Sequence, residues 1–237
     1  TLIPNMLDVI STNISHKVEE VSAFECGNTF IPQEGLPIET KKYCVGMYGK
    51  EVDFFVLKGV IESVLNNVGL KGYEIEPETT NLTFHPGRCA KIVYNNIYIG
   101  TFGELHPDVI ENYNLGQRVY VAEINIDTVF ENLNLTKSYN PLPKYPATSR
   151  DLAMLVDVDV NAADIEKAMT KAAGQNLTQI TLFDVYTGKQ VEEGKKSLAF
   201  SLTFQSNDKT LTDAEIDPAI EKIVAKLQKD FNANLRG

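Results

Sequence analysis

Three prolines within six residues constrain the fold of this 237-residue chain more than any other feature of its sequence. Pro141, Pro143 and Pro146 lie in the segment SYNPLPKYPA. Each proline fixes its own φ angle and disfavours the helical conformation in the residue before it, so the segment favours an extended linker. We therefore predict a first domain over residues 1–137, a linker over residues 138–148 and a second domain over residues 149–237.

The composition is that of a globular protein with apolar residues enough for two cores, since 43% of the residues are apolar. No apolar run approaches the roughly 18 residues of a membrane helix, and the first residues, TLIPNMLDVIS, have no basic region before an apolar one. We expect a cytoplasmic location and no membrane partner. Cys26, Cys44 and Cys89 lack the C-x-x-C spacing, so we expect reduced thiols and no bound metal.

The net charge of −10 argues against generic nucleic-acid binding and against DNA as a partner, because phosphate contacts need a basic surface. Residues 1–143 carry 10 Lys+Arg and 18 Asp+Glu, a net charge of −8, whereas residues 144–237 carry 12 and 14, a net charge of −2. The acidic excess therefore lies almost entirely in the first part of the chain.

The second part alternates between patterns typical of strands and of helices. A capping box of Thr212 and Glu215 predicts the start of its last helix, which contains Pro218, and Gly174 predicts the end of an earlier helix. The predicted order is a strand at 151–156, a helix at 162–174, strands at 180–186 and 197–204 joined by a polar loop, the capped helix and an edge strand in ANLRG. This order is βαββαβ, the ferredoxin-like fold of the α+β class.

One face of the predicted sheet carries mostly small side chains. In SLAFSLTF the four large apolar residues point one way, and Ser197, Ala199, Ser201 and Thr203 point the other way. Asp184 and Tyr186 share a parity, and Ala153 is out of phase with Leu152. A tyrosine, a carboxylate and small residues on one face suit the stacking of a flat base and hydrogen bonds to its edge. The alternative is a solvated sheet face on which Tyr186 is an ordinary surface aromatic.

At this point the sequence resembles a known family. LPKYPATSRDLAMLVD, LFDVYTG, EGKKSLAFSLTF and TLTDAEI are similar to the C-terminal ferredoxin-like anticodon-binding domain of the β subunit of bacterial phenylalanine–tRNA ligase. LIPNMLDVISTNI, VDFFVLKGVIESVL, FHPGRCAKI and IGTFGELHPDV are similar to the domain that precedes it. The resemblance covers essentially the whole chain, but the family's β subunit is several times longer, so it implies only the C-terminal portion.

The resemblance implies that residues 1–137 form a class II synthetase-like domain, built on an antiparallel sheet, that has lost catalysis. The residues agree, because VSAFECGNTF contains no arginine for the α-phosphate and IGTFGELHP ends without the arginine that binds ATP. The resemblance further implies the catalytic α subunit as a partner in an (αβ)₂ assembly. It implies ATP and Mg²⁺ for the full enzyme, which esterifies phenylalanine to tRNA(Phe) through an adenylate, and no cofactor in this fragment.

The resemblance also implies RNA-binding roles at individual positions. Tyr186 would stack on an anticodon base, Asp184 and Ser197 would contact base edges, and Ala153 would allow close approach. The expected phosphate contacts are Arg150, Lys195 and Lys196. The family often has two adjacent arginines before DLA, and here Ser149 replaces the first.

Two other classes of function stay open from the residues alone. His85, Cys89 and His106 suggest a Cys-His nucleophile, as in a hydrolase, although no oriented base or oxyanion site is identifiable and both His-Pro pairs fit turns better. A ferredoxin-like module is also compatible with a small-molecule sensor, whose ligand pocket would lie between domains.

Overall fold

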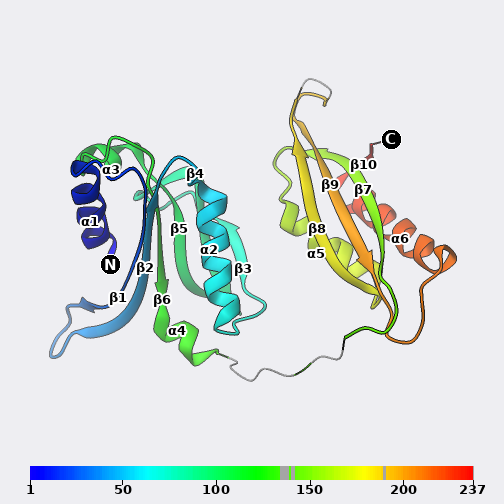
Figure 1. Ribbon diagram of the computed structural model, residues 1–237, viewed down its shortest axis with the longest axis horizontal. Helices are drawn as coiled ribbons and strands as arrows, with labels where there is room; N and C mark the ends of the chain where they lie inside the picture. The colour runs from blue at the N-terminus through cyan, green and yellow to red at the C-terminus, as the bar shows by residue number, and fades with distance from the viewer. Residues whose placement is uncertain (134–138, 140–141, 189–190, 237) are drawn as a thin grey trace. The chain divides into compact units, whose positions relative to one another are not determined.

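The computed structural model describes residues 1–133, 139, 142–188 and 191–236. The chain forms two compact units, residues 1–138 and 139–237, which are shown in Figure 1. Of the predicted linker, residues 138, 140 and 141 lie outside the described residues, and the first strand of the second unit begins at Thr148. Within the described ranges, the helices are all too short or too polar to cross a membrane.

The first unit is built on a six-stranded sheet in which every strand pair is antiparallel, as expected. The strands follow the order β1-β2-β6-β5-β4-β3 across the sheet. The elements of this unit are α1 (Ile3–Ser15), β1 (Val21–Ile31), β2 (Ile38–Tyr48), α2 (Phe54–Asn67), β3 (Glu74–Pro77), β4 (Phe84–Tyr94), β5 (Ile97–Leu105), α3 (Pro107–Asn112), β6 (Tyr120–Asn125) and α4 (Ile126–Glu131).

Helices bury both faces of this sheet. On one face α2 contributes Leu57, Ile61 and Leu65, whose spacing of four residues places them on one side of the helix. On the other face α1 packs its own apolar stripe against β2. The contact is close because Gly46 has no side chain: a Cβ there would lie 2.6 Å from Cγ of Met6. The sheet of the first unit is therefore the middle layer of three.

The second unit has the predicted order βαββαβ, with the strands in the order β10-β7-β9-β8 across an antiparallel sheet. Gly174, with φ of 79°, ends the first helix, and the capping box of Thr212 and Glu215 begins the second. Both signals were correctly predicted. The elements are β7 (Thr148–Asp157), α5 (Ala162–Ala173), β8 (Leu177–Tyr186), β9 (Lys195–Phe204), α6 (Asp213–Phe231) and β10 (Asn234–Leu235).

The second unit has one core, between the sheet and both of its helices. Phe200 in β9 and Met154 in β7 pack in one cluster with Met169 of α5 and Ile223 of α6. Figure 1 shows α5 and α6 on the same side of the sheet. Among the described residues of this unit, no helix covers the opposite side, and we call it the open face.

Several details of the strands differ from the prediction: β7 begins at Thr148 rather than 151, and β8 begins at Leu177 rather than 180. β9 begins at Lys195 rather than 197, because Lys195 and Lys196 pair with Asp157 and Val156 of β7. In β8 the pairing shifts between Leu182 and Asp184, so the strand contains a bulge at residue 183. A bulge adds one residue to one strand and resets its alternation. Leu182 therefore packs against the core although strict alternation would place it with Asp184.

Candidate nucleic-acid interface

The strand pairing brings the predicted base-contacting residues together in two rows on the open face. Ala199 lies opposite Ala153 on one side and Asp184 on the other. In the next row, Ser197 lies between Leu155 and Tyr186. The predicted grouping of Ala153, Asp184, Tyr186 and Ser197 on one face is therefore what the pairing produces.

The exposure of these residues varies along the rows. Asp184 is exposed, and the Tyr186 side chain is 36% exposed. Between β7 and β8 the surface is low, because on β9 Ala199 is 9% exposed and Ser197 only 4% exposed. A flat base fits over alanines more closely than over longer side chains, but the Ser197 hydroxyl meets a base edge only if the neighbouring side chains move. Its role as a hydrogen-bonding group stays a prediction.

Arg236 is a residue of the open face that the sequence analysis missed. Its backbone N–H donates to the carbonyl oxygen of Ala153 at 3.0 Å, which extends the pairing of β10 with β7. Its guanidinium carbon lies 5.6 Å from the centroid of the Tyr186 ring, within the range of a cation–π interaction. The predicted edge strand in ANLRG contained the signal, because pairing that strand with β7 places an arginine beside Ala153.

The three predicted phosphate contacts do not share one face. Arg150 lies opposite Leu202, a core residue, so its side chain leaves the sheet on the side of the helices, where it forms an ion pair with Asp213 at the start of α6. Lys196 lies opposite the core residue Val156, and burial lowers its pKa.

Only Lys195 has the parity of Ser197 and lies on the open face. Its Nζ atom is 3.4 Å from Glu192 Oε2. We therefore place one of the three predicted cations beside the tyrosine. Phosphate contacts by Arg150 and Lys196 stay predictions, made from the opposite side of the sheet.

His85 and His106 act in turns, as predicted. Nδ1 of His85 accepts a hydrogen bond from the Gly87 N–H at 3.1 Å, and Nδ1 of His106 accepts one from the Asp108 N–H at 3.2 Å. His106 thereby caps the start of α3. Cys89 is buried, and burial raises the pKa of its thiol to about 12. A nucleophilic cysteine needs an accessible thiol with a lowered pKa. The buried Cys89 therefore does not support the hydrolase alternative.

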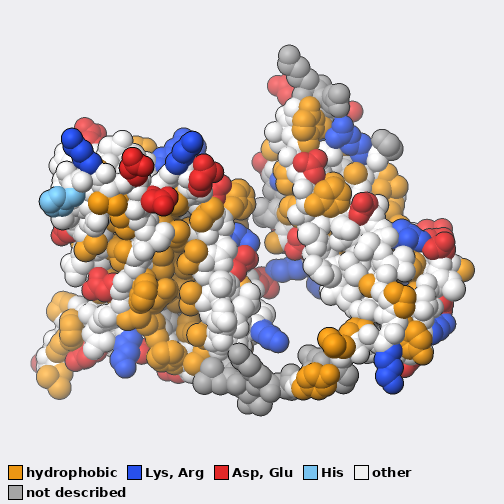
Figure 2. Space-filling view, in the orientation of Figure 1, with side chains coloured by type: hydrophobic (Ala, Val, Ile, Leu, Met, Phe, Trp, Pro, Cys, Tyr) orange, Lys and Arg blue, Asp and Glu red, His pale blue; other side chains and the backbone are white. Residues whose placement is uncertain are grey.

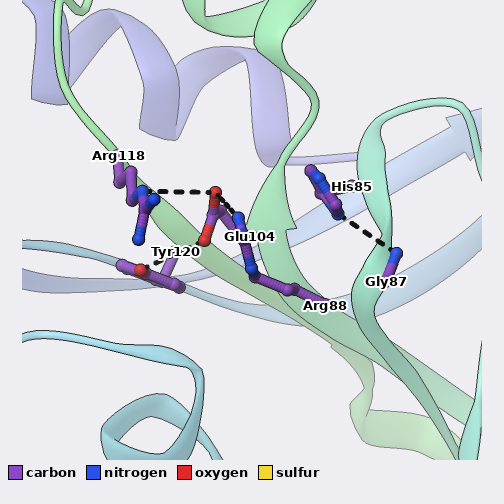
Figure 3. A network of polar contacts seen from close by, with 6 residues as sticks. All are labelled: His85, Gly87, Arg88, Glu104, Arg118 and Tyr120. Atoms are coloured by element: carbon purple, nitrogen blue, oxygen red, sulfur yellow. Dashed lines mark hydrogen bonds and ion pairs between the residues drawn. The ribbon is translucent and has the colours of Figure 1, made fainter. Parts of the chain in front are cut away.

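Glu104, at the end of β5, is the buried carboxylate of the first unit, with 4% exposure. It lies between Arg88 and Arg118 (Figure 3), and its Oε1 atom is 2.7 Å from Nη1 of Arg88 and 3.7 Å from Nε of Arg118. The Tyr120 hydroxyl donates to its second oxygen at 3.2 Å. The buried carboxylate thus compensates one of the two positive charges beside it and holds both arginines at the end of β5.

Metal-binding groups are not assembled in the part of the chain that the structure describes, where no cluster of three or more His, Cys, Asp or Glu residues occurs. Cys26 is exposed, Cys44 and Cys89 are buried, and all three are free thiols.

Two protein families match the two units. Residues 1–126 match the family described as "Phenylalanyl tRNA synthetase beta chain CLM domain", and residues 143–236 match "Ferredoxin-fold anticodon binding domain". The second description agrees with the βαββαβ order of the second unit.

Similar proteins carry the same name. The phenylalanine–tRNA ligase beta subunit of Clostridium tetani is 40% identical over 239 residues, and that of Clostridium acetobutylicum is 41% identical over 239 residues. Each alignment covers 100% of this chain and 30% of the relative, so the chain spans about 30% of the length of these relatives. A solved pyrrolysyl-tRNA synthetase from Desulfitobacterium hafniense is similar over 55% of this chain and 47% of its own, at 12% identity and a TM-score of 0.45, which supports no conclusion.

The first family match spans 126 of the 237 residues, and the relatives align over the full chain. The chain therefore belongs to the phenylalanyl-tRNA synthetase beta-chain family.

Proposed function

We propose that this chain is part of a phenylalanine–tRNA ligase β subunit and that its second unit binds the anticodon stem-loop of tRNA(Phe). The observation that carries the proposal is the open face, on which Tyr186 and Asp184 lie beside the low surface of Ala153 and Ala199. Sequence-specific RNA recognition uses unstacked loop bases, which stack on aromatic side chains and are read along their edges. The open face offers both kinds of group.

Each residue of the open face has a defined role in this proposal. Tyr186 stacks on one anticodon base, and the Asp184 carboxylate accepts a hydrogen bond from the N–H group of a base edge. Ala153 allows the base to approach the sheet. Lys195 contacts phosphate, and the Ser197 hydroxyl serves the base edge once the side chains near it have moved.

The first unit supports the catalytic α subunit, in the proposed (αβ)₂ assembly, rather than performing chemistry. Its β1–β2 hairpin exposes large apolar side chains, among them Phe30 at 59% and Leu36 at 85% exposure, and Figure 2 shows apolar side chains gathered over this part of the unit. Exposed apolar patches mark partner surfaces.

We further propose that this chain forms no adenylate. Arg88 and Arg118, at this end of β5, are both ion-paired with the buried Glu104, whose carboxylate competes with a triphosphate for them. The complete ligase would use ATP and Mg²⁺ at the α subunit and act in the cytoplasm.

The test is a titration of the fluorescently labelled anticodon stem-loop of tRNA(Phe) with this chain at two salt concentrations. We expect binding that weakens as salt rises, because phosphate contacts release counterions, and that exceeds binding of a stem-loop with a changed anticodon. Equal affinity for both loops, or no binding at the lower salt concentration, would contradict the proposal.

A further inference from the structure

We propose that Gly188 is a positioning residue, whose missing side chain leaves the space in which the Tyr186 ring lies. The inference rests on the proposed function for its effect on RNA binding, because it concerns the geometry of the stacking residue. Neither the family match nor the sequence pattern assigned a role to Gly188.

The Tyr186 ring fills the space that a side chain at residue 188 would need. A Cβ atom at Gly188 would lie 2.1 Å from Oη, 2.2 Å from Cζ and 2.8 Å from Cε2 of Tyr186. Real Cβ atoms essentially never lie within 3.0 Å of a heavy atom to which they are not bonded through the neighbouring chain. Any residue larger than glycine at this position therefore moves the ring.

The backbone does not itself require glycine at residue 188. Gly174 and Gly194, in the same unit, have φ of 79° and 81°, where other residues are strained, but Gly188 is not among the residues with positive φ. Glycine at this position thus permits the close approach of the Tyr186 ring. An alanine is compatible with the turn and incompatible with the present position of the ring.

A second contact defines the ring position from a distant part of the chain. The guanidinium carbon of Arg236, which follows β10, lies 5.6 Å from the ring centroid. The ring therefore touches the turn after β8 at its hydroxyl end and an arginine from the opposite edge of the sheet. If a side chain at residue 188 displaces the ring, the ring no longer contacts the arginine and no longer lies in the row of Ser197.

The displacement has little cost for the fold, and this makes it testable. The clashing atoms belong to the far end of the Tyr186 side chain, which is 36% exposed and turns about two torsion angles. We expect Gly188→Ala to change where the ring lies while the thermal midpoint of the second unit falls by no more than about 2 °C.

The experiment compares Gly188→Ala, Tyr186→Ala and the double variant, each in the full 237-residue chain. The probe is an anticodon stem-loop with 2-aminopurine at one anticodon position, which reports affinity and, through quenching, stacking of that base. We expect Tyr186→Ala to weaken binding about 5- to 150-fold. Gly188→Ala should weaken binding by at least about five-fold and reduce quenching, but add less than about two-fold when Tyr186 is already alanine, because the two residues act as one.

Three results would overturn the inference: unchanged affinity in Gly188→Ala, an equal loss in the presence and absence of Tyr186, or weakened binding with unchanged quenching in the bound state. A measurement without RNA separates this inference from the proposed function. The NMR signals of the Arg236 side chain should carry a ring-current shift that Gly188→Ala removes. If the chain binds no stem-loop but this shift disappears, the proposed function fails and the positioning role stands; if the shift persists, the positioning role fails.

Discussion

The sheets of the two units differ in how many of their faces are buried. In the first unit α1 and α2 cover opposite faces, and buried apolar clusters lie on both sides of the strands. In the second unit α5 and α6 share one face and one cluster. A sheet that is buried on both sides is a structural layer, whereas a sheet with one open face has a surface on which a flat ligand can lie. The comparison explains why the candidate interface belongs to the smaller unit.

The arginines of the molecule have two kinds of partner. Arg88 and Arg118 surround the buried Glu104, and Arg150 pairs with Asp213. Arg236 instead lies against an aromatic ring on the open face. Arg88, Arg118 and Arg150 contact carboxylates, whereas Arg236 lies with Lys195 on the open face, next to the proposed stacking residue.

The largest expected effect tests the single core of the second unit. Phe200 is fully buried, so Phe200→Ala should lower the free energy of unfolding of this unit by about 3–5 kcal/mol through lost burial and the cavity left behind. Hydrogen exchange of the β7 and β9 amides in urea measures it. Phe183→Ala, at the β8 bulge and 56% exposed, is the matched control and should cost less than about 1 kcal/mol. Similar losses in both variants would mean that the loss does not depend on burial in the single core.

The next effect tests whether the buried carboxylate of the first unit is structural. Glu104→Gln keeps the shape but removes the charge between Arg88 and Arg118, and we expect a loss of about 1–3 kcal/mol, below that of a fully buried pair because both arginines are partly exposed. The reaction of Cys89 with a thiol reagent in urea measures unfolding of this unit. Glu76→Gln, which removes the exposed pair with Lys91, should cost about 0–1 kcal/mol. Equal losses of unfolding free energy in the two variants would mean that the buried ion pair contributes no more to stability than the exposed one.

A third effect, on binding, tests the open face itself. Tyr186→Ala should weaken binding of the anticodon stem-loop by about 1–3 kcal/mol, because one base loses its stacking partner. The measurement is a titration at fixed salt. Tyr98→Ala changes a tyrosine of the first unit that is 52% exposed and should leave the affinity unchanged. An unaffected Tyr186→Ala variant would mean that Tyr186 is an ordinary surface residue.

The smallest effect separates the two faces of the second sheet. Arg150→Gln should change stem-loop affinity less than about two-fold, since the Arg150 side chain leaves the sheet on the helix side, away from the open face. Lys195→Gln, on the open face, should lower the slope of log affinity against log salt by about 0.7, the value for one phosphate contact on a single strand. If Arg150→Gln changed RNA binding more than Lys195→Gln did, Arg150 would be the main phosphate contact, and the RNA would bind the helix side of the sheet.

Part of the candidate site could be predicted from the sequence, because it depends only on the alternation of side chains along single strands. The alternation in β9 predicted its row of small residues. Alternation along β7 likewise places Arg150 with Leu152 on the core side. The parity of Asp184 with Tyr186 was also predicted correctly, but the phase of the whole of β8 was not. The bulge at residue 183 depends on how β8 meets β9, and the spacing within one strand contains no information about its partner.

The sequence by itself determined the βαββαβ order, the end of α5 at Gly174 and the start of α6 at Thr212, because glycines and caps act on the residues next to them. Tertiary structure alone decided the partners of distant side chains. Residue 236 meets residue 186 only after β10 has paired with β7, and Glu104 is buried only when β4, β5 and β6 lie side by side. Such contacts depend on strand register, which is fixed by the packing of the whole core.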